Sequence, residues 1–147
     1  MIQKVRLALD HASHAAQFSP DAETKVGAIL LDEFFDPIDR RWNSFISGHT
    51  GEGLPNTRPH KYSFMLHAER RLLFNCARNG IPTDGRYVVC TLSPCPDCLR
   101  ALWESGIRKV FFRERYREID ASLAMTDLHI LETELENDIF QWNLSIR

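Results

Sequence analysis

The chain has 147 residues, of which 44% are hydrophobic and 26% are charged, and this composition is typical of folded proteins and excludes wholesale disorder. The length suits a single domain, which we expect to span residues 1–147. The net charge of −2 provides no bulk positive field, and from residue 114 onward eight acidic residues stand against three arginines, so a long nucleic acid is not an expected partner.

The first half of the sequence predicts a helix, two strands and a loop. Apolar residues recur at steps of three and four over residues 2–16, which is the spacing of an amphipathic helix. Residues 26–31 form a short apolar run that predicts a buried strand, and residues 44–47 are its expected partner. Residues 48–59 are rich in Gly and Pro and predict a loop, where functional residues are often found.

The second half of the sequence alternates helices and strands. In chain order we expect a helix from about 67 to 79, a strand over 87–92, a helix from about 95 to 105, a strand over 109–112, a weaker helix over 119–125 and a strand over 128–131. After Thr133 the pattern is ambiguous, and it fits an amphipathic helix against the body or a partner subunit. This alternation predicts one three-layer αβα domain of the α/β class, with a central mixed sheet of about five strands.

No segment has the features of a membrane span or of a secretory signal. The longest apolar run covers residues 26–31, whereas a spanning helix needs about 20 residues. The N-terminal segment is charged and amphipathic and has no uninterrupted apolar core. We therefore expect a cytoplasmic protein without a membrane partner.

Two short motifs carry the chemistry of the chain. The first is His67-Ala68-Glu69, and the second is Ser93-Pro94-Cys95-Pro96-Asp97-Cys98. Both fall where helices are predicted to begin, and the positive end of a helix dipole favours thiolates. A catalytic zinc ion uses three protein ligands and keeps its fourth position for water, and His67, Cys95 and Cys98 supply such a set.

Glu69 gives the metal site a candidate for proton transfer. As a fourth ligand it would close the site. Left unligated beside a metal-activated water, it can accept a proton from that water and pass it to a leaving group. These residues suit a hydrolytic attack on an electrophilic carbon, such as the amine-bearing carbon of a nucleobase.

The motifs identify a resemblance to the zinc-dependent nucleobase deaminases, which carry an H-x-E and P-C-x-x-C signature. Within that superfamily the chain most resembles the deoxycytidylate (dCMP) deaminase group, over roughly residues 1–130. The matching segments are Lys25-Val26-Gly27-Ala28-Ile29, His67-Ala68-Glu69, Thr91-Leu92-Ser93-Pro94-Cys95-Pro96-Asp97-Cys98 and Gly106-Ile107-Arg108-Lys109-Val110.

The resemblance implies a cytidine deaminase-like fold and a zinc-dependent deamination of dCMP to dUMP with release of ammonia. One catalytic Zn²⁺ would be bound by His67, Cys95 and Cys98, and Glu69 would move protons. Some members hold a second, structural zinc, but no cysteine lies between residues 1 and 71, so we expect a single ion. The substrate would be a small nucleotide, and the protein a homo-oligomer, often a hexamer in this group.

The resemblance also implies four substrate contacts. The backbone N–H of Ala68 would face the carbonyl oxygen of the pyrimidine. Lys25 stands where the group has a basic residue, and Tyr116 falls where it has a tyrosine near the substrate. The group carries Tyr-Asn-Gly after its second strand, with the asparagine on the sugar, whereas here Thr50 takes that place.

Several other interpretations of these residues remain open. A redox CxxC site leaves the His67 motif unexplained. A structural zinc module that binds a partner protein needs four protein ligands, and His60 or Cys90 could be the fourth. A tRNA adenosine deaminase, a deaminase of free bases and the pyrimidine deaminase of riboflavin synthesis share the zinc chemistry, but the acidic C-terminal segment argues against docking on RNA.

Two further groups of residues have simpler explanations. Cys76 and Cys90 lie on apolar faces and are expected to be inert core thiols. Arg58, His60 and Lys61 could contact a phosphate, or they could belong to a solvated loop. The sequence alone does not separate these two possibilities.

Overall fold

The computed structural model describes residues 1–116 and 127–147, and within them it shows a mixed sheet of six strands in the order β2-β1-β3-β4-β6-β5. The elements are α1 (Ile2–Ala16), β1 (Gly27–Leu31), β2 (Pro37–Trp42), the short 3₁₀ helix η1 (His60–Ser63), α2 (Ala68–Asn79), β3 (Tyr87–Leu92), α3 (Pro96–Glu104), β4 (Lys109–Glu114), β5 (Leu128–Glu136) and β6 (Ile139–Ile146). In this described part, no helix combines the length and apolar character needed to cross a membrane.

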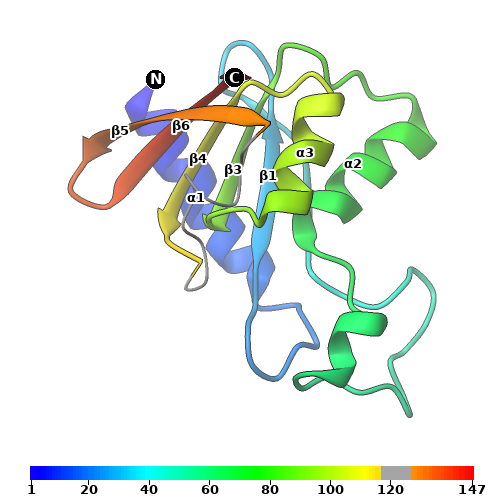
Figure 1. Cartoon of the computed structure of the whole chain (residues 1–147). Coiled ribbons are helices and arrows are strands. Elements are labelled where there is room, and N and C mark those ends of the chain that lie inside the picture. The colour runs from blue at the N-terminus through cyan, green and yellow to red at the C-terminus, as the bar shows by residue number, and fades with distance from the viewer. Residues whose placement is uncertain (117–126) are drawn as a thin grey trace.

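Two apolar layers hold the helices on opposite faces of the sheet (Figure 1). α1 covers one face, where Leu9 packs in a cluster with Phe111 of β4. α2 and α3 cover the other face over a larger core, which includes Leu72, Leu102 and Trp142. The expected three-layer α/β architecture is therefore confirmed, as is the burial of Cys76 and Cys90 in the core.

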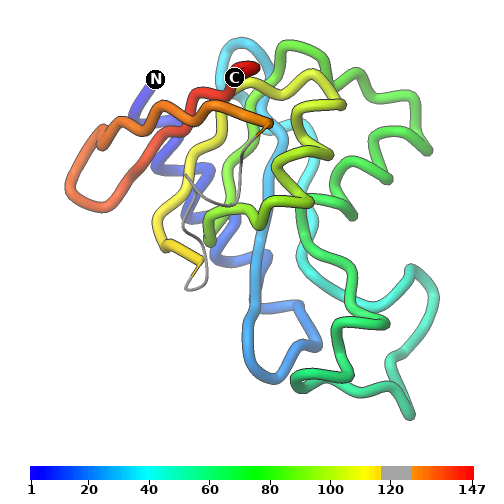
Figure 2. Tube along the Cα trace, in the orientation of Figure 1, coloured from blue at the N-terminus to red at the C-terminus, as the bar shows by residue number. Residues whose placement is uncertain are grey.

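The strand order places α2 and α3, the helices that begin at the two motifs, on one face of the sheet. β1 pairs in antiparallel fashion with β2 and β3, whereas β3 and β4 are parallel and are connected through α3. Figure 2 shows that the loop after α1 and the segment before α2 lie at the same end of the molecule, near the start of α2. This end of the fold carries the candidate site.

The partner of β1 differs from the expectation. The strand that pairs with β1 is β2, over Pro37–Trp42, whereas Ser44 forms only an isolated bridge with Leu66. The expected strand over residues 44–47 is wrong. β2 lies at the edge of the sheet, carries two arginines and an aspartate, and has no fully buried residue, so it lacks the apolar run that predicts a buried strand.

The C-terminal residues form a strand rather than a helix. β6 pairs with β4 on one side and with β5 on the other, both in antiparallel fashion. Because Trp142 and Leu144 of β6 belong to the core on the α2 and α3 side, the apolar residues after Thr133 serve the sheet directly. This strand raises the number from the expected five to six. The weaker helix expected over residues 119–125 lies outside the described residues.

Candidate active site

Three side chains with zinc-binding chemistry meet where α2 and α3 begin. His67 immediately precedes α2, Cys95 immediately precedes α3, and Cys98 lies in the first turn of α3. The Nδ1 atom of His67 is 3.5 Å from the Sγ atom of Cys95 and 3.3 Å from that of Cys98. All three ligand atoms lie within 4.8 Å of one another, so the group could hold one metal ion.

The spacing of the three atoms fits a tetrahedral zinc site. Zn–N bonds of about 2.1 Å and Zn–S bonds of about 2.3 Å place nitrogen and sulfur about 3.6 Å apart, close to the observed separations. Within residues 1–116 and 127–147 the group has no fourth His, Cys, Asp or Glu, and neither His60 nor Cys90 belongs to it. Three protein ligands leave one tetrahedral position for water, as in catalytic zinc sites.

The local sequence explains why the two sulfurs face His67. Cys95 has an extended backbone, with φ −70° and ψ 165°, and Pro96 occupies the first turn of α3, where a missing N–H is tolerated. The Sγ atom of Cys95 accepts the backbone N–H of Cys98 at 3.5 Å. Cys95 is therefore the N-cap of α3, at the positive end of the helix dipole.

The electrostatics of the group favour a thiolate at Cys95. The hydrogen bond from the Cys98 thiol, assisted by the one with His67, lowers the pKa of Cys95 to about 4. The same hydrogen bond and burial raise the pKa of Cys98, because Cys98 is the donor. The hydrogen bond with Cys95 raises the pKa of His67. Zinc binds cysteine as thiolate, so this arrangement suits the metal.

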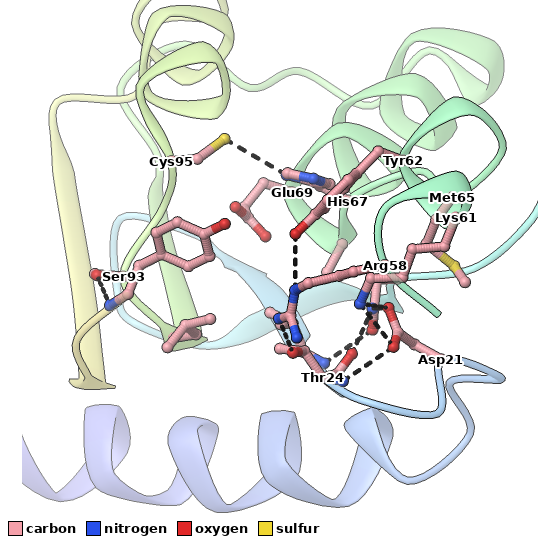
Figure 3. Close-up of a pocket in the computed structure, with 15 residues that line it drawn as sticks. Asp21, Thr24, Arg58, Lys61, Tyr62, Met65, His67, Glu69, Ser93 and Cys95 are labelled. Carbon is pink, nitrogen blue, oxygen red and sulfur yellow. Dashed lines mark hydrogen bonds and ion pairs between the residues drawn. The ribbon is translucent and has the colours of Figure 1, made fainter. Parts of the chain in front are cut away.

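Glu69 is not one of the three candidate ligands, but its carboxyl group forms a hydrogen bond with the side chain of Cys98. It is in the first turn of α2, and only 4% of it is exposed. Burial raises the pKa of its carboxyl group, against the opposing charge of His67. In Figure 3 this carboxyl group points into the space below Cys95. A buried carboxyl group beside a candidate metal site can accept and donate protons, as a general acid or base does.

A pocket leads from this group to the two loops at the same end of the fold (Figure 3). Its wall contains apolar and aromatic side chains, namely Val26, Tyr62, Met65, Leu92 and Tyr116. It also contains polar side chains, namely Asp21, Thr24, Asn43, Arg58, Lys61 and Ser93, and the two kinds are mixed, since Tyr62 bonds to Arg58 and Tyr116 to Ser93. The pocket can therefore take a ligand that has an aromatic part and a polar part.

Two of the four expected substrate contacts line this pocket. Ala68 lies in its wall at the first position of α2, and Tyr116 lies in its wall beyond the end of β4. The backbone N–H of Tyr116 donates to the Oγ atom of Ser93 at 2.7 Å, and Ser93 is buried. Tyr116 is thus attached to the strand-to-helix turn that carries Cys95.

The other two expected contacts, Lys25 and Thr50, are not among the described residues that line the pocket. Both are exposed. The Nζ atom of Lys25 donates to the backbone carbonyl of Ser19, and the hydroxyl of Thr50 accepts the N–H of Glu52. Their roles as substrate contacts stay predictions.

Sequence reasoning missed Asn43, a polar residue of the pocket wall that directly follows β2. Its side-chain oxygen accepts the N–H of Val26 at 2.8 Å, and its side-chain nitrogen donates to the carbonyl of Thr24 at 2.8 Å. The available signal was an asparagine directly after the second strand. Because the second strand was expected over residues 44–47 instead of Pro37–Trp42, the position after it was assigned to Thr50 and not to Asn43.

Comparison with known proteins gives matches of the same kind in sequence and in structure. Residues 2–114 match the model of the family described as "Cytidine and deoxycytidylate deaminase zinc-binding region". A deoxycytidylate deaminase of Enterobacteria phage T4 is 45% identical over 51 residues, which cover 35% of this chain but only 26% of that protein. The human deoxycytidylate deaminase is 26% identical over 117 residues, covering 75% of this chain and 65% of that protein.

A solved structure supports the same similarity over more of the chain. The dCMP deaminase of the cyanophage S-TIM5, in complex with dCMP and dUMP, superposes with a TM-score of 0.68 at 31% sequence identity. The match covers 82% of this chain and 88% of the cyanophage chain.

Proposed function

Since the chain belongs to the cytidine and deoxycytidylate deaminase zinc-binding family, we propose that it catalyses the hydrolytic deamination of dCMP, in which dCMP and water give dUMP and ammonia. The supporting observation is the combination of three candidate zinc ligands, His67, Cys95 and Cys98, with the buried acid Glu69 beside them. The choice of dCMP follows the substrate named for the similar human and phage enzymes.

His67, Cys95 and Cys98 are the zinc ligands in this proposal. Zinc held by them would leave one position for water and would lower the pKa of that water towards about 7. The three ligands sit at the starts of two helices that are packed on the same face of the sheet. The site is therefore built on rigid elements, which a reaction with strict geometry requires.

Glu69 carries the protons of the reaction. Its carboxylate takes one proton from the attacking water and delivers it to the ring nitrogen N3, while the water oxygen bonds to C4. It then transfers the second proton of that water to the amine on C4, the C–N bond breaks and ammonia leaves. Both deliveries occur in one small volume, which suits a single buried carboxyl group.

Ala68 and Tyr116 orient the substrate. The first N–H groups of an α-helix have no partner within the helix, and Ala68 is the first residue of α2. Its N–H, in the pocket wall, donates to the carbonyl oxygen of the pyrimidine. Tyr116 contributes an aromatic side chain to the same wall.

The substrate is tested by measuring ammonia release from dCMP, CMP, deoxycytidine, cytosine and adenosine side by side. The proposal expects the highest kcat/KM with dCMP. A preference for adenosine within a tRNA anticodon stem-loop, with affinity that falls steeply as salt rises, would support the RNA-directed alternative instead. No ammonia from any of these substrates, with zinc bound, would favour a non-catalytic zinc module.

The role of Glu69 is tested with Glu69→Gln. This variant should keep its zinc and lose activity by roughly 100- to 10,000-fold, which is the range for a general acid–base. Glu104→Gln is the matched control, because Glu104 is an exposed residue at the end of α3. A Glu69→Gln variant with bound zinc and the wild-type rate would contradict the proposal.

The protein is also proposed to be a cytoplasmic homo-oligomer. Ile46 and Phe74 are each more than half exposed and line one groove together with Trp42, against which the exposed Phe18 packs. A contiguous exposed apolar surface of this kind is typical of surfaces that are covered by another subunit. Light scattering after size-exclusion chromatography measures the mass directly, and a mass of one chain at micromolar concentration would contradict this.

A further inference from the structure

The basic residues near the pocket differ sharply in what they can bind. Arg58 and Lys61 line it, whereas His60 is exposed and is not among the described lining residues. We propose that Arg58 binds the phosphate group of the substrate and gives the enzyme its preference for a nucleotide over a nucleoside. This inference rests on the proposed function, because it assigns a specificity-determining residue to the same site.

Lys61 is not available for a phosphate, because its charge is already neutralised. Its Nζ atom is 2.8 Å and 3.0 Å from the two carboxylate oxygens of Asp21, and both side chains are only 3% exposed. A third carboxylate oxygen, from Glu23, lies 3.5 Å away. Removing Lys61 from Asp21 would leave a buried carboxylate without its partner, which is costly.

Arg58 is held in the pocket wall by two neutral hydroxyl groups and by one carboxylate, that of Glu23. Its Nε atom donates to the hydroxyl of Tyr62 at 2.8 Å, and one terminal nitrogen donates to the hydroxyl of Thr24 at 2.9 Å. Figure 3 shows the guanidinium between these two residues. A guanidinium has five N–H donors, so the bonds to Tyr62 and Thr24 orient it, and the N–H groups that face neither these residues nor Glu23 can bind a ligand.

The position of Arg58 suits the end of the substrate that is remote from the base. In Figure 3 its guanidinium is well separated from Cys95, which is one of the three candidate zinc ligands. With the pyrimidine amine at the metal group, the sugar and phosphate must extend away from it along the pocket. Arginine binds phosphate oxygens with two parallel N–H bonds, and its oriented guanidinium is well suited to this.

Glu23 competes for the same cation. One of its carboxylate oxygens lies 3.3 Å from a terminal nitrogen of Arg58, and the other accepts the backbone N–H of Arg58 at 2.5 Å. Its side chain is 31% exposed, so it can turn to solvent when a phosphate arrives. Removing its charge should therefore tighten the binding of a phosphorylated substrate, an effect opposite in sign to the removal of Arg58.

The test is the kinetics of Arg58→Met and Glu23→Gln with dCMP and with deoxycytidine. Arg58→Met should raise the KM for dCMP roughly 10- to 100-fold, the range for losing a charge-assisted hydrogen bond, and leave deoxycytidine unchanged. Glu23→Gln should lower the KM for dCMP roughly 2- to 5-fold. Arg58→Lys should restore part of the loss, and Arg40→Met, at an exposed position of β2, is the matched control.

Inhibition by a sugar phosphate provides a second measurement, and it does not need turnover of a nucleoside. 2-Deoxyribose 5-phosphate should inhibit the wild type competitively and inhibit Arg58→Met much more weakly. Equal losses with dCMP and deoxycytidine, or unchanged inhibition by the sugar phosphate, would overturn the role of Arg58. Those results would leave the proposed deamination intact, whereas a wild type that releases no ammonia from dCMP would refute the proposed function itself.

Discussion

Asp21 and Lys61 form a buried ion pair that joins two loops of the candidate active site. The ammonium of Lys61, in η1, contacts both carboxylate oxygens of Asp21, which follows α1, and both side chains are 3% exposed. The backbone N–H groups of Glu23 and Thr24 also donate to Asp21, at 2.8 Å and 3.0 Å. The pair therefore fixes the segment that leads into His67 against the loop that precedes β1.

Breaking this pair from one side should destabilise the protein strongly. Lys61→Met leaves a buried carboxylate without its cation, and the expected loss is about 3–5 kcal/mol of the free energy of unfolding. Urea denaturation measures it. The matched control is Lys4→Met, because Lys4 and Asp36 form a pair with the same N–O distance of 2.8 Å whose side chains are 51% and 56% exposed. Exposed pairs are worth about 1 kcal/mol or less.

The double variant Asp21→Asn with Lys61→Met should be more stable than Lys61→Met alone, because it no longer buries an unpaired charge. If the double variant lost as much as the sum of the two single changes, Asp21 and Lys61 would be contributing independently and the interpretation as a coupled pair would be wrong.

The same pair predicts a dependence of stability on pH. Burial raises the pKa of Asp21, but the hydrogen bonds from Lys61 and from the backbone of Thr24 and Glu23 outweigh burial and hold the pKa below its ordinary value. The stabilisation is therefore complete above the unfolded pKa of about 3.9, and it is lost as the pH falls through the folded pKa.

Asp21→Asn isolates this contribution. The difference in unfolding free energy between wild type and Asp21→Asn should be constant from pH 7 to about pH 5 and should shrink below about pH 4, because protonated Asp21 no longer carries the charge. Urea titrations at several pH values measure this difference. A gap that stayed constant down to pH 2 would show that the charge of Asp21 contributes nothing.

Most of the fold could be predicted from the sequence because its elements have strong periodic signals. The helix over residues 2–16 and the strand over residues 87–92 have the expected boundaries, since their apolar spacing and the surrounding turns agree. β2 and β6 could not be found in this way. An edge strand with charged residues has no apolar run, and the apolar positions of β6 fit a helix as well as a strand until its pairing with β4 is known.

The three candidate zinc ligands could be predicted because they lie in two local motifs. The contacts between the loops of the pocket could not be predicted. Asp21, Arg58 and Lys61 form contacts over sequence separations of 34 to 40 residues. Both cations line the pocket, and only the folded chain shows that Lys61 is buried in an ion pair with Asp21, whereas Arg58 is held by the hydroxyls of Tyr62 and Thr24 and by Glu23. Local patterns carry no information on such pairings, so the sequence could offer Arg58 and Lys61 only as equal candidates.

Gly27 is predicted to be essential for the packing of α1 on the sheet. A Cβ atom added at Gly27 would lie 1.9 Å from the backbone carbonyl oxygen of Ala12 in α1 and 2.8 Å from its carbon. A backbone group cannot turn away as a flexible side chain can, so Gly27→Ala must shift α1 from β1. We expect a loss of about 1–3 kcal/mol in the free energy of unfolding, the range for overpacking.

The control for this prediction is Gly53→Ala, because a Cβ atom there meets nothing within 4 Å. Its φ of +79° adds a modest backbone cost, so the variant measures that cost without a steric clash. Thermal unfolding of both variants gives the comparison. If Gly27→Ala were as stable as the wild type, the predicted clash between a Cβ atom at Gly27 and the backbone of Ala12 would be contradicted.

Zinc should be bound at one ion per chain, and its removal should lower both stability and activity. Cys98→Ala deletes one of the three candidate ligands, so zinc measured by elemental analysis should fall well below one ion per chain. The melting temperature should fall with it, because a metal that binds only the folded chain stabilises that state.

Cys76→Ala is the matched control, since Cys76 is equally buried but lies in the apolar core, away from the three candidate zinc ligands. It should lose some stability through the cavity it leaves and still retain its zinc. Equal zinc content in both variants would show that the two motif helices do not meet at a metal, and the chemistry assigned to Glu69 would have no activated water to act on.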